Sequence, residues 1–582
     1  MWPLKLILDW IPLFQHLKSY DLRKLGRDCR AGLNVALLDF PQGMAYAMIA
    51  GLPVQFGIFS SAIGSITGPV FAGSRFLMLG PTNASAVLLL SGFLALGLPD
   101  DQKLAALPML LVMISAILFL GALLRIELVI QYVSRCVITG YITAAALLII
   151  VNQLKYILGV QVPRSGTFFG TMVLTTQHLH EIDWRELICA TTTLLIYYGL
   201  VRFKKIPTVA LTLVVISTLN FALEKFYGVS AQTLEAIPSA SWSLTWPVFS
   251  MDLLSQLMGV AFALAFLSLL ESSSIAKSLA AQSGDQVNIR QQMISMGVSN
   301  ACNAIGNGMP VSGSLTRSML NWKSGAVTPV SSIVSGSLLV VGFFVLGHSI
   351  SAIPKSALAS LVMIVGLSLI KMDNIRIFLT VTRTDGATFL VTFLGGLFLP
   401  LDKAIYLGVG LSLLFFLKKV ARPKMVELAF NPSGELSETI EDKHEAISIV
   451  HVEGDLFFGS ADAFLDQVRK QLSNGRVKVL IIRMLNAQNM DGSAALAIRE
   501  IVNFTRQGDQ HILLSGIREE VAKVLEKVGV LKQLGAKNVF YYTPGKITVS
   551  TRGAVIRAHE ILGASVPTEE NEQQYKNWAY II

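Results

Sequence analysis

Two short polar stretches, each lying just after a proline within an apolar region, carry side chains that could bind an anion. One follows Pro81 and the other follows Pro310. A helix that starts after such a break presents unpaired backbone N–H groups and a partial positive charge, which together form an anion site. Hydroxyl and amide side chains at a helix start add hydrogen-bond donors. The candidate binding residues at the two starts are Thr82, Asn83, Ser314, Thr316 and Arg317.

These residues also have structural explanations, which the sequence leaves open. Serine, threonine and asparagine cap helices whether or not a ligand binds, and Gly or Pro kinks are common in membrane helices. Arg317 lies one turn into the second short helix. It could bind the anion, raise the potential beside it, or extend its head group to the membrane interface.

Glu271 is the second kind of candidate, because it could exchange a proton. It lies in a long apolar run in which Lys277 is the one other charged residue. A carboxylate there is costly unless it is paired, solvated or protonated. Since burial favours the neutral form of a carboxyl group, we expect Glu271 to take up and release a proton near neutral pH. The alternative is a structural pair with Arg317 or Lys277.

The first apolar segment adds three further candidates. Asp39 is an intramembrane acid two residues before Pro41, and we predict that it contributes to coupling. Gln42 and Tyr46 lie four residues apart and therefore share one helix face. That face either lines the binding site or packs against neighbouring helices.

The composition places these residues in a membrane. Of the 582 residues, 53% are hydrophobic and 15% are charged, whereas soluble domains carry roughly 25% charged residues. Residues 1–426 hold 30 basic and 18 acidic side chains, and residues 427–582 hold 17 and 20. The basic excess lies among apolar runs rather than on a basic stripe, which argues against nucleic-acid binding. Cysteines and histidines lack ligand spacing, so we expect no metal and no cofactor.

The apolar runs predict fourteen membrane segments, each near the length that a helix needs to cross a bilayer or interrupted by Gly and Pro. An even number puts both termini on one side, and the distribution of Lys and Arg makes that side cytoplasmic. The segments are 30–50, 56–72, 81–93, 104–124, 136–158, 187–203, 207–223, 252–275, 292–308, 312–322, 328–347, 356–370, 385–400 and 402–417.

The two short segments occupy the third position of each half of seven. Matching breaks in corresponding positions indicate inverted repeats with a binding site at the membrane midplane. We therefore predict a cytoplasmic N-terminal segment at 1–29 and a transport domain at 30–424. Its repeats span about 30–226 and 250–420.

Residues 425–582 are predicted to form a cytoplasmic linker and an α/β domain. Apolar runs at 446–454, 477–485 and 511–517 indicate strands. They alternate with helical patterns at 460–472, 491–507 and 518–534, as in parallel βαβ units. Ser493 stands at a helix start, where Asp491 or Ser493 itself caps the helix and where phosphate on Ser493 could act as a switch.

The chain resembles the SulP family of anion transporters, also called solute carrier family 26. Its tail is similar to a STAS domain, and its turn at 491–494 is similar to the phosphoacceptor turn of anti-sigma-factor antagonists. The stretches that carry the resemblance are 31–33, 40–47, 50–53, 73–75, 80–81, 271–273, 297–300, 317–321, 325–328 and 491–494.

This resemblance implies a seven-plus-seven inverted repeat with a core and a gate domain, usually dimeric. It places the anion site on Gln42, Tyr46, Thr82, Asn83, Ser314, Thr316 and Arg317, with Glu271 at the acidic coupling position. Two positions depart from the family pattern. Thr82 stands where many relatives have an aromatic residue, and Asp39 occupies a place that we expect to be uncharged.

We therefore expect a homodimeric secondary transporter of small inorganic or carboxylate anions, surrounded by membrane lipid. Sulfate is the expected substrate, with a proton or sodium as co-substrate. The alternatives are a sodium-coupled bicarbonate or dicarboxylate transporter, a nucleobase transporter or an anion exchanger of the same fold. A channel-like or signalling protein is another. An enzyme is not expected, because no nucleophile, base and orienting group are evident. The short loops suit a bacterial inner membrane.

Overall fold

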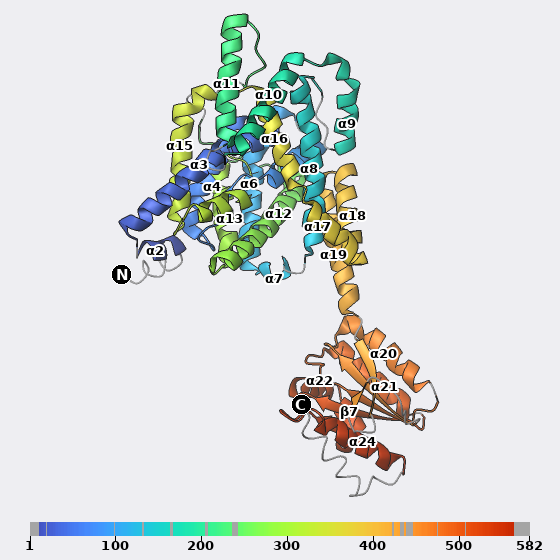
Figure 1. The fold of residues 1–582 in the computed structure, drawn as a ribbon. Coiled ribbons are helices and arrows are strands. Elements are labelled where there is room, and N and C mark those ends of the chain that lie inside the picture. Colours follow the sequence, from blue (N-terminus) through green and yellow to red (C-terminus); the bar gives the residue numbers. More distant parts are fainter. Residues whose placement is uncertain are drawn as a thin grey trace. The chain divides into compact units, whose positions relative to one another are not determined.

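The computed structural model describes residues 11–18, 20–97, 99–130, 133–162, 167–203, 208–234, 242–421, 424–430, 436–437, 446–473, 475–506 and 508–563. Two compact units, Met1–Leu413 and Leu414–Ile582, make up the chain (Figure 1). Part of the predicted N-terminal segment, residues 1–10, lies outside the described residues.

The first unit is helical, and its first half contains one very short strand. Its elements are α2 (Pro12–Leu17), α3 (Leu22–Ala50), α4 (Val54–Thr67), η1 (Gly68–Phe71), β1 (Leu79–Gly80), α5 (Asn83–Ala95), α6 (Asp100–Leu123), α7 (Glu127–Ile130), α8 (Arg135–Leu158), α9 (Phe168–Gln177), η2 (Leu179–Glu181), α10 (Trp184–Val201) and α11 (Thr208–Tyr227).

The second half of this unit has the same kind of break before its third helix. Its elements are α12 (Met251–Ser283), α13 (Ile289–Ile305), β2 (Ser312–Gly313), α14 (Leu315–Lys323), α15 (Val330–Ile350), α16 (Lys355–Leu369), α17 (Met372–Val381), α18 (Arg383–Phe398) and α19 (Leu401–Val420).

Every predicted membrane segment overlaps one of these helices, with shifted ends. By length and apolar composition, seven helices of the described chain could each cross a membrane unaided. The sequence did not predict α9 and α17, because each has 10 residues, half of what a crossing helix needs. The helix predicted at 30–50 begins earlier, at Leu22, because Asp21 caps it by accepting a hydrogen bond from the Lys24 N–H at 2.7 Å.

Close backbone contact fixes α3 beside α4. A Cβ on Gly57 would lie 1.8 Å from the carbonyl oxygen of Gly43, so both helices need glycine where they meet. Gly51 ends α3 in the left-handed conformation, with φ 72°. These contacts hold the face of α3 that carries Asp39 against α4, whose Ser61 hydroxyl donates to that carboxylate at 2.9 Å.

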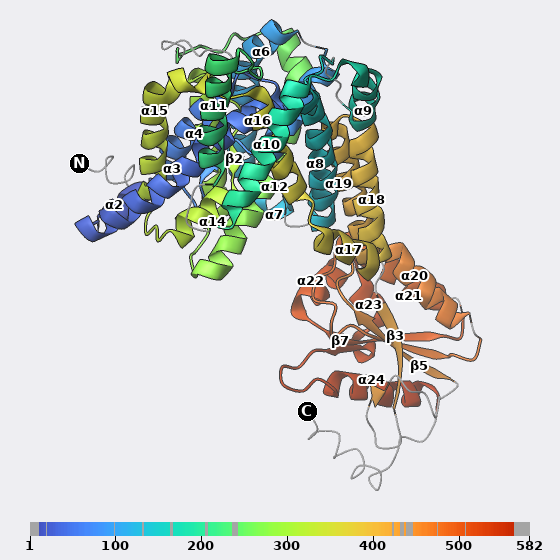
Figure 2. The same cartoon turned by 45° about the horizontal axis from the view of Figure 1, so that its top comes forward.

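The second unit is a sheet of six strands covered by helices on both faces (Figure 2). The strand order is β4-β3-β5-β6-β7-β8, and β5 to β8 are parallel. The helices α20, α21 and α22 share one apolar core with the sheet, and α24 covers the opposite face. The strands and helices are β3 (Lys424–Phe430), β4 (Leu436–Ser437), β5 (Ile447–Glu453), α20 (Phe458–Leu472), β6 (Val479–Arg483), α21 (Gly492–Arg506), β7 (His511–Ile517), α22 (Glu519–Lys527), α23 (Val530–Leu534), η3 (Ala536–Asn538), β8 (Val539–Tyr541) and α24 (Val549–Ile561).

The three predicted strands and the α/β character of this unit are confirmed. The single helix predicted at 518–534 is wrong, because Gly529 takes a left-handed conformation with φ 84° and separates α22 from α23. The strands β3, β4 and β8 and the helix α24 were not predicted. The α24 segment has little apolar periodicity, since small residues such as Ala554 and Ala558 make its contact with the sheet.

Candidate anion site

The two polar stretches meet inside the membrane unit. Strands β1 and β2 pair antiparallel, with Leu79 opposite Gly313 and Gly80 opposite Ser312. The Ser314 N–H extends this ladder by donating to the Met78 carbonyl at 3.0 Å. Helices α5 and α14 therefore start side by side from one short ribbon, although some 230 residues separate them in the sequence.

The start of α5 is capped by its own side chains. Thr82 is the N-cap residue and accepts the Ser85 N–H at 3.2 Å, while the Ser85 hydroxyl accepts the Thr82 N–H at 3.1 Å. Asn83 accepts the Ala84 N–H through its side-chain oxygen at 2.8 Å. Capping, the structural alternative for these residues, is therefore present, and the Thr82 hydroxyl still has a hydrogen to donate.

The start of α14 differs, because no side chain caps it. The Ser314 hydroxyl lies 3.4 Å from the Thr316 hydroxyl, and Thr316 is exposed. The Ser318 hydroxyl accepts the Met78 N–H at 2.9 Å and donates to the Ser314 carbonyl, which fixes the helix start to β1. The first-turn amides of α14 thus keep the positive potential that an anion would use.

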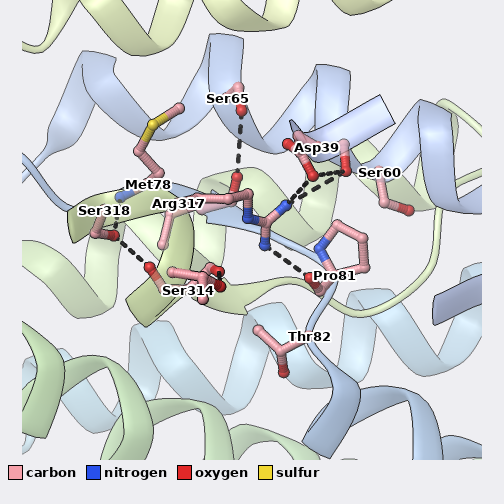
Figure 3. A network of polar contacts seen from close by, with 12 residues as sticks. Asp39, Ser60, Ser65, Met78, Pro81, Thr82, Ser314, Arg317 and Ser318 are labelled. Atoms are coloured by element: carbon pink, nitrogen blue, oxygen red, sulfur yellow. Dashed lines mark hydrogen bonds and ion pairs between the residues drawn. The ribbon is translucent and has the colours of Figure 1, made fainter. Parts of the chain in front are cut away.

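Arg317 forms a buried ion pair with Asp39 between these helix starts (Figure 3). The guanidinium Nη1 donates to the Asp39 carboxylate at 2.6 Å, and Nη2 donates to the Pro81 carbonyl at 2.7 Å. Both side chains have 0% exposure. Extension of Arg317 to the membrane interface, one of the predicted alternatives, is therefore wrong. Direct contact between Arg317 and an anion stays a prediction, because in this structure the guanidinium binds Asp39 and the Pro81 carbonyl.

The Glu271 carboxylate accepts two hydroxyl hydrogen bonds, one from each half of the unit. Thr82 and Ser312 each donate to Oε2 at 3.2 Å. Glu271 is not ion-paired with Arg317, whose carboxylate partner is Asp39, and Lys277 is exposed. The predicted alternative of a structural ion pair is therefore wrong. The residue as a whole is half-buried, and its carboxylate lies where the starts of α5 and β2 meet.

The two remaining candidates on α3 lie near the ion pair. Tyr46 is 5% exposed, and the side-chain oxygen of Gln42 is buried without a hydrogen-bond partner among the described residues. The shared face of Gln42 and Tyr46 is therefore turned into the protein. Whether it contacts an anion stays a prediction.

Sequence reasoning missed several residues that position the site. The side-chain amide of Asn300 pairs with the Val311 backbone, accepting its N–H at 3.1 Å and donating to its carbonyl at 3.2 Å. Tyr141 donates to the Ala84 carbonyl at 2.9 Å, and Ser272 accepts the Gly313 N–H at 2.8 Å. The available signal is a polar side chain within an apolar helix, as at Tyr141, Ser272 and Asn300.

Replacing Asn300 by leucine is expected to destabilise the membrane unit. The change keeps the size of the side chain but leaves the Val311 N–H and carbonyl unpaired in a buried place, at about 1–3 kcal/mol for each group. Thermal unfolding of the detergent-solubilised chain measures the loss. Asn303→Leu is the matched control, because the Asn303 amide donates to Ser299 on its own helix. Equal losses for the two variants would contradict this role of Asn300.

In the C-terminal unit, Ser493 lies in the first turn of α21 and is exposed. Asp491 is the cap, because its carboxylate accepts the Ala494 N–H at 2.9 Å and the Phe458 N–H at 2.7 Å. Of the two predicted alternatives, Asp491 rather than Ser493 is therefore the residue that caps α21. The Ser493 hydroxyl is left accessible, and its modification stays a prediction.

The amino-acid sequence matches two known protein families, one in each part of the chain. The sulfate permease family matches residues 25–392, more than half of the chain. The chain belongs to the sulfate permease family. A STAS domain matches residues 438–543 of the chain. The predicted family and the predicted transporter rather than enzyme are confirmed.

Relatives of the chain are named as sulfate or anion transporters. It is 25% identical to "Sulfate transporter 4.1, chloroplastic" of Arabidopsis thaliana over 92% of this chain and 82% of the relative. It is 29% identical to the "Sodium-independent sulfate anion transporter" of Bos taurus over 73% and 75%. The solved structure of the murine Solute Carrier 26 family member A9 anion transporter, inward-facing, matches with TM-score 0.84 at 20% identity, over 96% of this chain and 95% of that one. That likeness confirms the predicted fold of membrane helices followed by a STAS domain.

Proposed function

We propose that this protein is a secondary transporter that moves sulfate together with a proton. The anion would bind between the starts of α5 and α14, where Thr82, Asn83, Ser314 and Thr316 supply donors beside the backbone amides. The observation that carries the proposal is the position of Glu271. Its carboxylate accepts a hydrogen bond from the Thr82 hydroxyl at the start of α5, where the anion would bind.

Charge balance gives the reason for coupling. Asp39 and Arg317 cancel each other, so the ionised Glu271 leaves the cluster with a net negative charge. An anion must then compete with the carboxylate for the same hydroxyl groups and against its repulsion. Protonation of Glu271 removes the repulsion and weakens its hydrogen bonds to these donors, because a neutral acceptor binds a donor less strongly than a charged one. Binding of the anion and uptake of a proton would therefore favour each other by linkage.

Several features support sulfate and a proton over the alternatives. The Arabidopsis thaliana and Bos taurus relatives are named as sulfate transporters, and the Bos taurus protein is named as sodium-independent. We further propose a homodimer in a bacterial inner membrane with both termini cytoplasmic, as the distribution of Lys and Arg predicts. A sodium-coupled bicarbonate or dicarboxylate transporter and an anion exchanger are outcomes of the test below.

The test is uptake of radiolabelled sulfate into proteoliposomes that contain the purified chain. An inward proton gradient is expected to raise uptake, and unlabelled sulfate is expected to compete better than bicarbonate, chloride or fumarate. Preloaded sulfate should accelerate uptake, because a carrier exchanges across the membrane and a pore does not. Competition by bicarbonate alone, or uptake that requires sodium, would contradict the proposed substrate or coupling ion.

Replacing Thr316 by valine is expected to weaken sulfate binding about 10- to 150-fold, because one hydrogen bond to a charged ligand contributes about 1.5–3 kcal/mol. Direct binding to the purified chain measures the change. Thr191→Val is the matched control, since the Thr191 hydroxyl is exposed and donates to its own helix at Leu187. Full affinity in the Thr316 variant would remove this residue from the site.

A further inference from the structure

A cavity of about 440 Å³ lies in the membrane unit where α8 ends and where α10 and α16 begin. Its lining includes Lys155 in the last turn of α8, Glu186 in the first turn of α10, and Lys355, the first residue of α16. The described residues that line this cavity include none of the candidate anion-site residues. Its volume falls in the range of small-molecule sites, about 300–1,000 Å³.

Backbone hydrogen bonds hold the walls of this cavity together. The Asp183 N–H donates to the Leu158 carbonyl at 3.0 Å, which joins the start of α10 to the end of α8. The Lys355 N–H donates to the Gln232 carbonyl at 2.8 Å, and the Gln232 N–H donates to Oε1 of Glu186. The charged residues of the lining are therefore attached to one another through the backbone, so the cavity is part of the fold.

Glu186 carries a carboxylate oxygen that lacks a donor. The residue is 2% exposed, and its Oε2 has no hydrogen-bond partner in the described part of the chain. The partial positive charge at the start of α10 favours an acid at this position, but it supplies no hydrogen to Oε2. A buried polar atom without a partner costs stability. A donor from outside the chain would remove that cost.

The lysines of the lining require the opposite group. Lys355 is half-buried, and its ammonium makes no hydrogen bond or ion pair with the residues that the structure describes. The Lys155 Nζ lies 5.1 Å from the centre of the Tyr156 ring, which also lines the cavity. Two ammonium groups and one carboxylate leave the lining with an excess of positive charge. A ligand for this cavity therefore needs negative charge as well as a hydrogen-bond donor.

We propose that this cavity binds an amino acid with an acidic side chain, such as glutamate or aspartate. The ligand's ammonium group donates to Oε2 of Glu186, and its carboxylates accept from Lys355 and face the charge of Lys155. An inorganic oxyanion such as sulfate has no hydrogen to donate, and its charge would be repelled by Glu186. The proposal does not depend on the proposed transport function.

Hydrogen–deuterium exchange on the purified full-length chain, at constant ionic strength, tests the site. At ten times its half-saturating concentration, L-glutamate is expected to slow exchange about tenfold in the peptides that cover the end of α8 and the start of α10. Glutarate has the same two carboxylates but no ammonium group. It is expected to bind about tenfold more weakly, so the same concentration slows exchange about twofold.

Two variants assign the two halves of the ligand. Glu186→Gln keeps an oxygen for the Gln232 N–H but removes the charge that pairs with the ammonium group, so glutamate and glutarate are expected to slow exchange equally. Lys355→Met is expected to abolish the slowing by both. Lys225→Met is the matched control, since Lys225 is exposed in the last turn of α11, and it is expected to respond like the wild type.

The wild-type chain and the Glu186 variant each offer a result that would overturn the proposal. In the wild type, these results are no slowing by glutamate, or slowing by glutarate or phosphate equal to that by glutamate. In Glu186→Gln, the result is a preference for glutamate that is as large as in the wild type.

Discussion

A chain in which Asp39 is replaced by alanine is expected to lose about 3–5 kcal/mol of stability and its sulfate uptake. Removing one partner of a buried ion pair leaves the other charge unpaired, and that cost is usually of this size. Here the unpaired group is the Arg317 guanidinium, which has 0% exposure. It also holds the Pro81 carbonyl at the start of α5. Thermal unfolding of the solubilised chain and uptake into proteoliposomes measure the two effects.

A double variant separates charge from packing. Asp39→Leu with Arg317→Met removes both charges and is expected to recover much of the lost stability, because a buried ion pair contributes little beyond its apolar replacement. Sulfate uptake is expected to stay low, since the double variant lacks the guanidinium that joins Asp39 on α3 to the Pro81 carbonyl at the start of α5. Ser61→Ala is a milder control, because it removes one hydrogen bond to Asp39 and leaves the ion pair intact. Equal instability of the single and double variants would refute the argument from unpaired charge.

The second large effect is expected at Glu271. In a Glu271→Gln chain, sulfate uptake should no longer respond to a proton gradient, because glutamine accepts the Thr82 and Ser312 hydrogen bonds but cannot take up a proton. Wild-type uptake should rise as the pH on the side of entry falls, since protonation of Glu271 removes the charge that opposes the anion. Uptake measured over a series of imposed gradients gives both slopes.

Asp252→Asn is the matched control for this variant. Asp252 is an exposed acid near the start of the same helix, α12, and its neutralisation should leave the gradient response unchanged. A Glu271→Gln chain with the wild-type slope would show that the coupling proton binds elsewhere. The anion site could then still stand, because its donors lie on other residues.

Much of the fold could be predicted because apolar length and Gly or Pro breaks are local signals. The starts of α5 and α14 were found in this way, within three residues of their observed positions. The helix α17 was not found, since its 10 residues fall below the length that the membrane criterion detects. The STAS domain strands were found from their apolar runs, and the break at Gly529 was missed because glycine alone does not determine φ.

The sequence by itself determined which residue types could carry the chemistry, because charges and hydroxyl groups in apolar surroundings need a reason to be there. Only the tertiary structure decided their partners. Arg317 pairs with Asp39, 278 positions away, and Glu271 receives hydroxyl groups from both halves of the unit. Nothing local in the sequence encodes such distances, since they depend on how α3, α12 and the ribbon of β1 and β2 pack together.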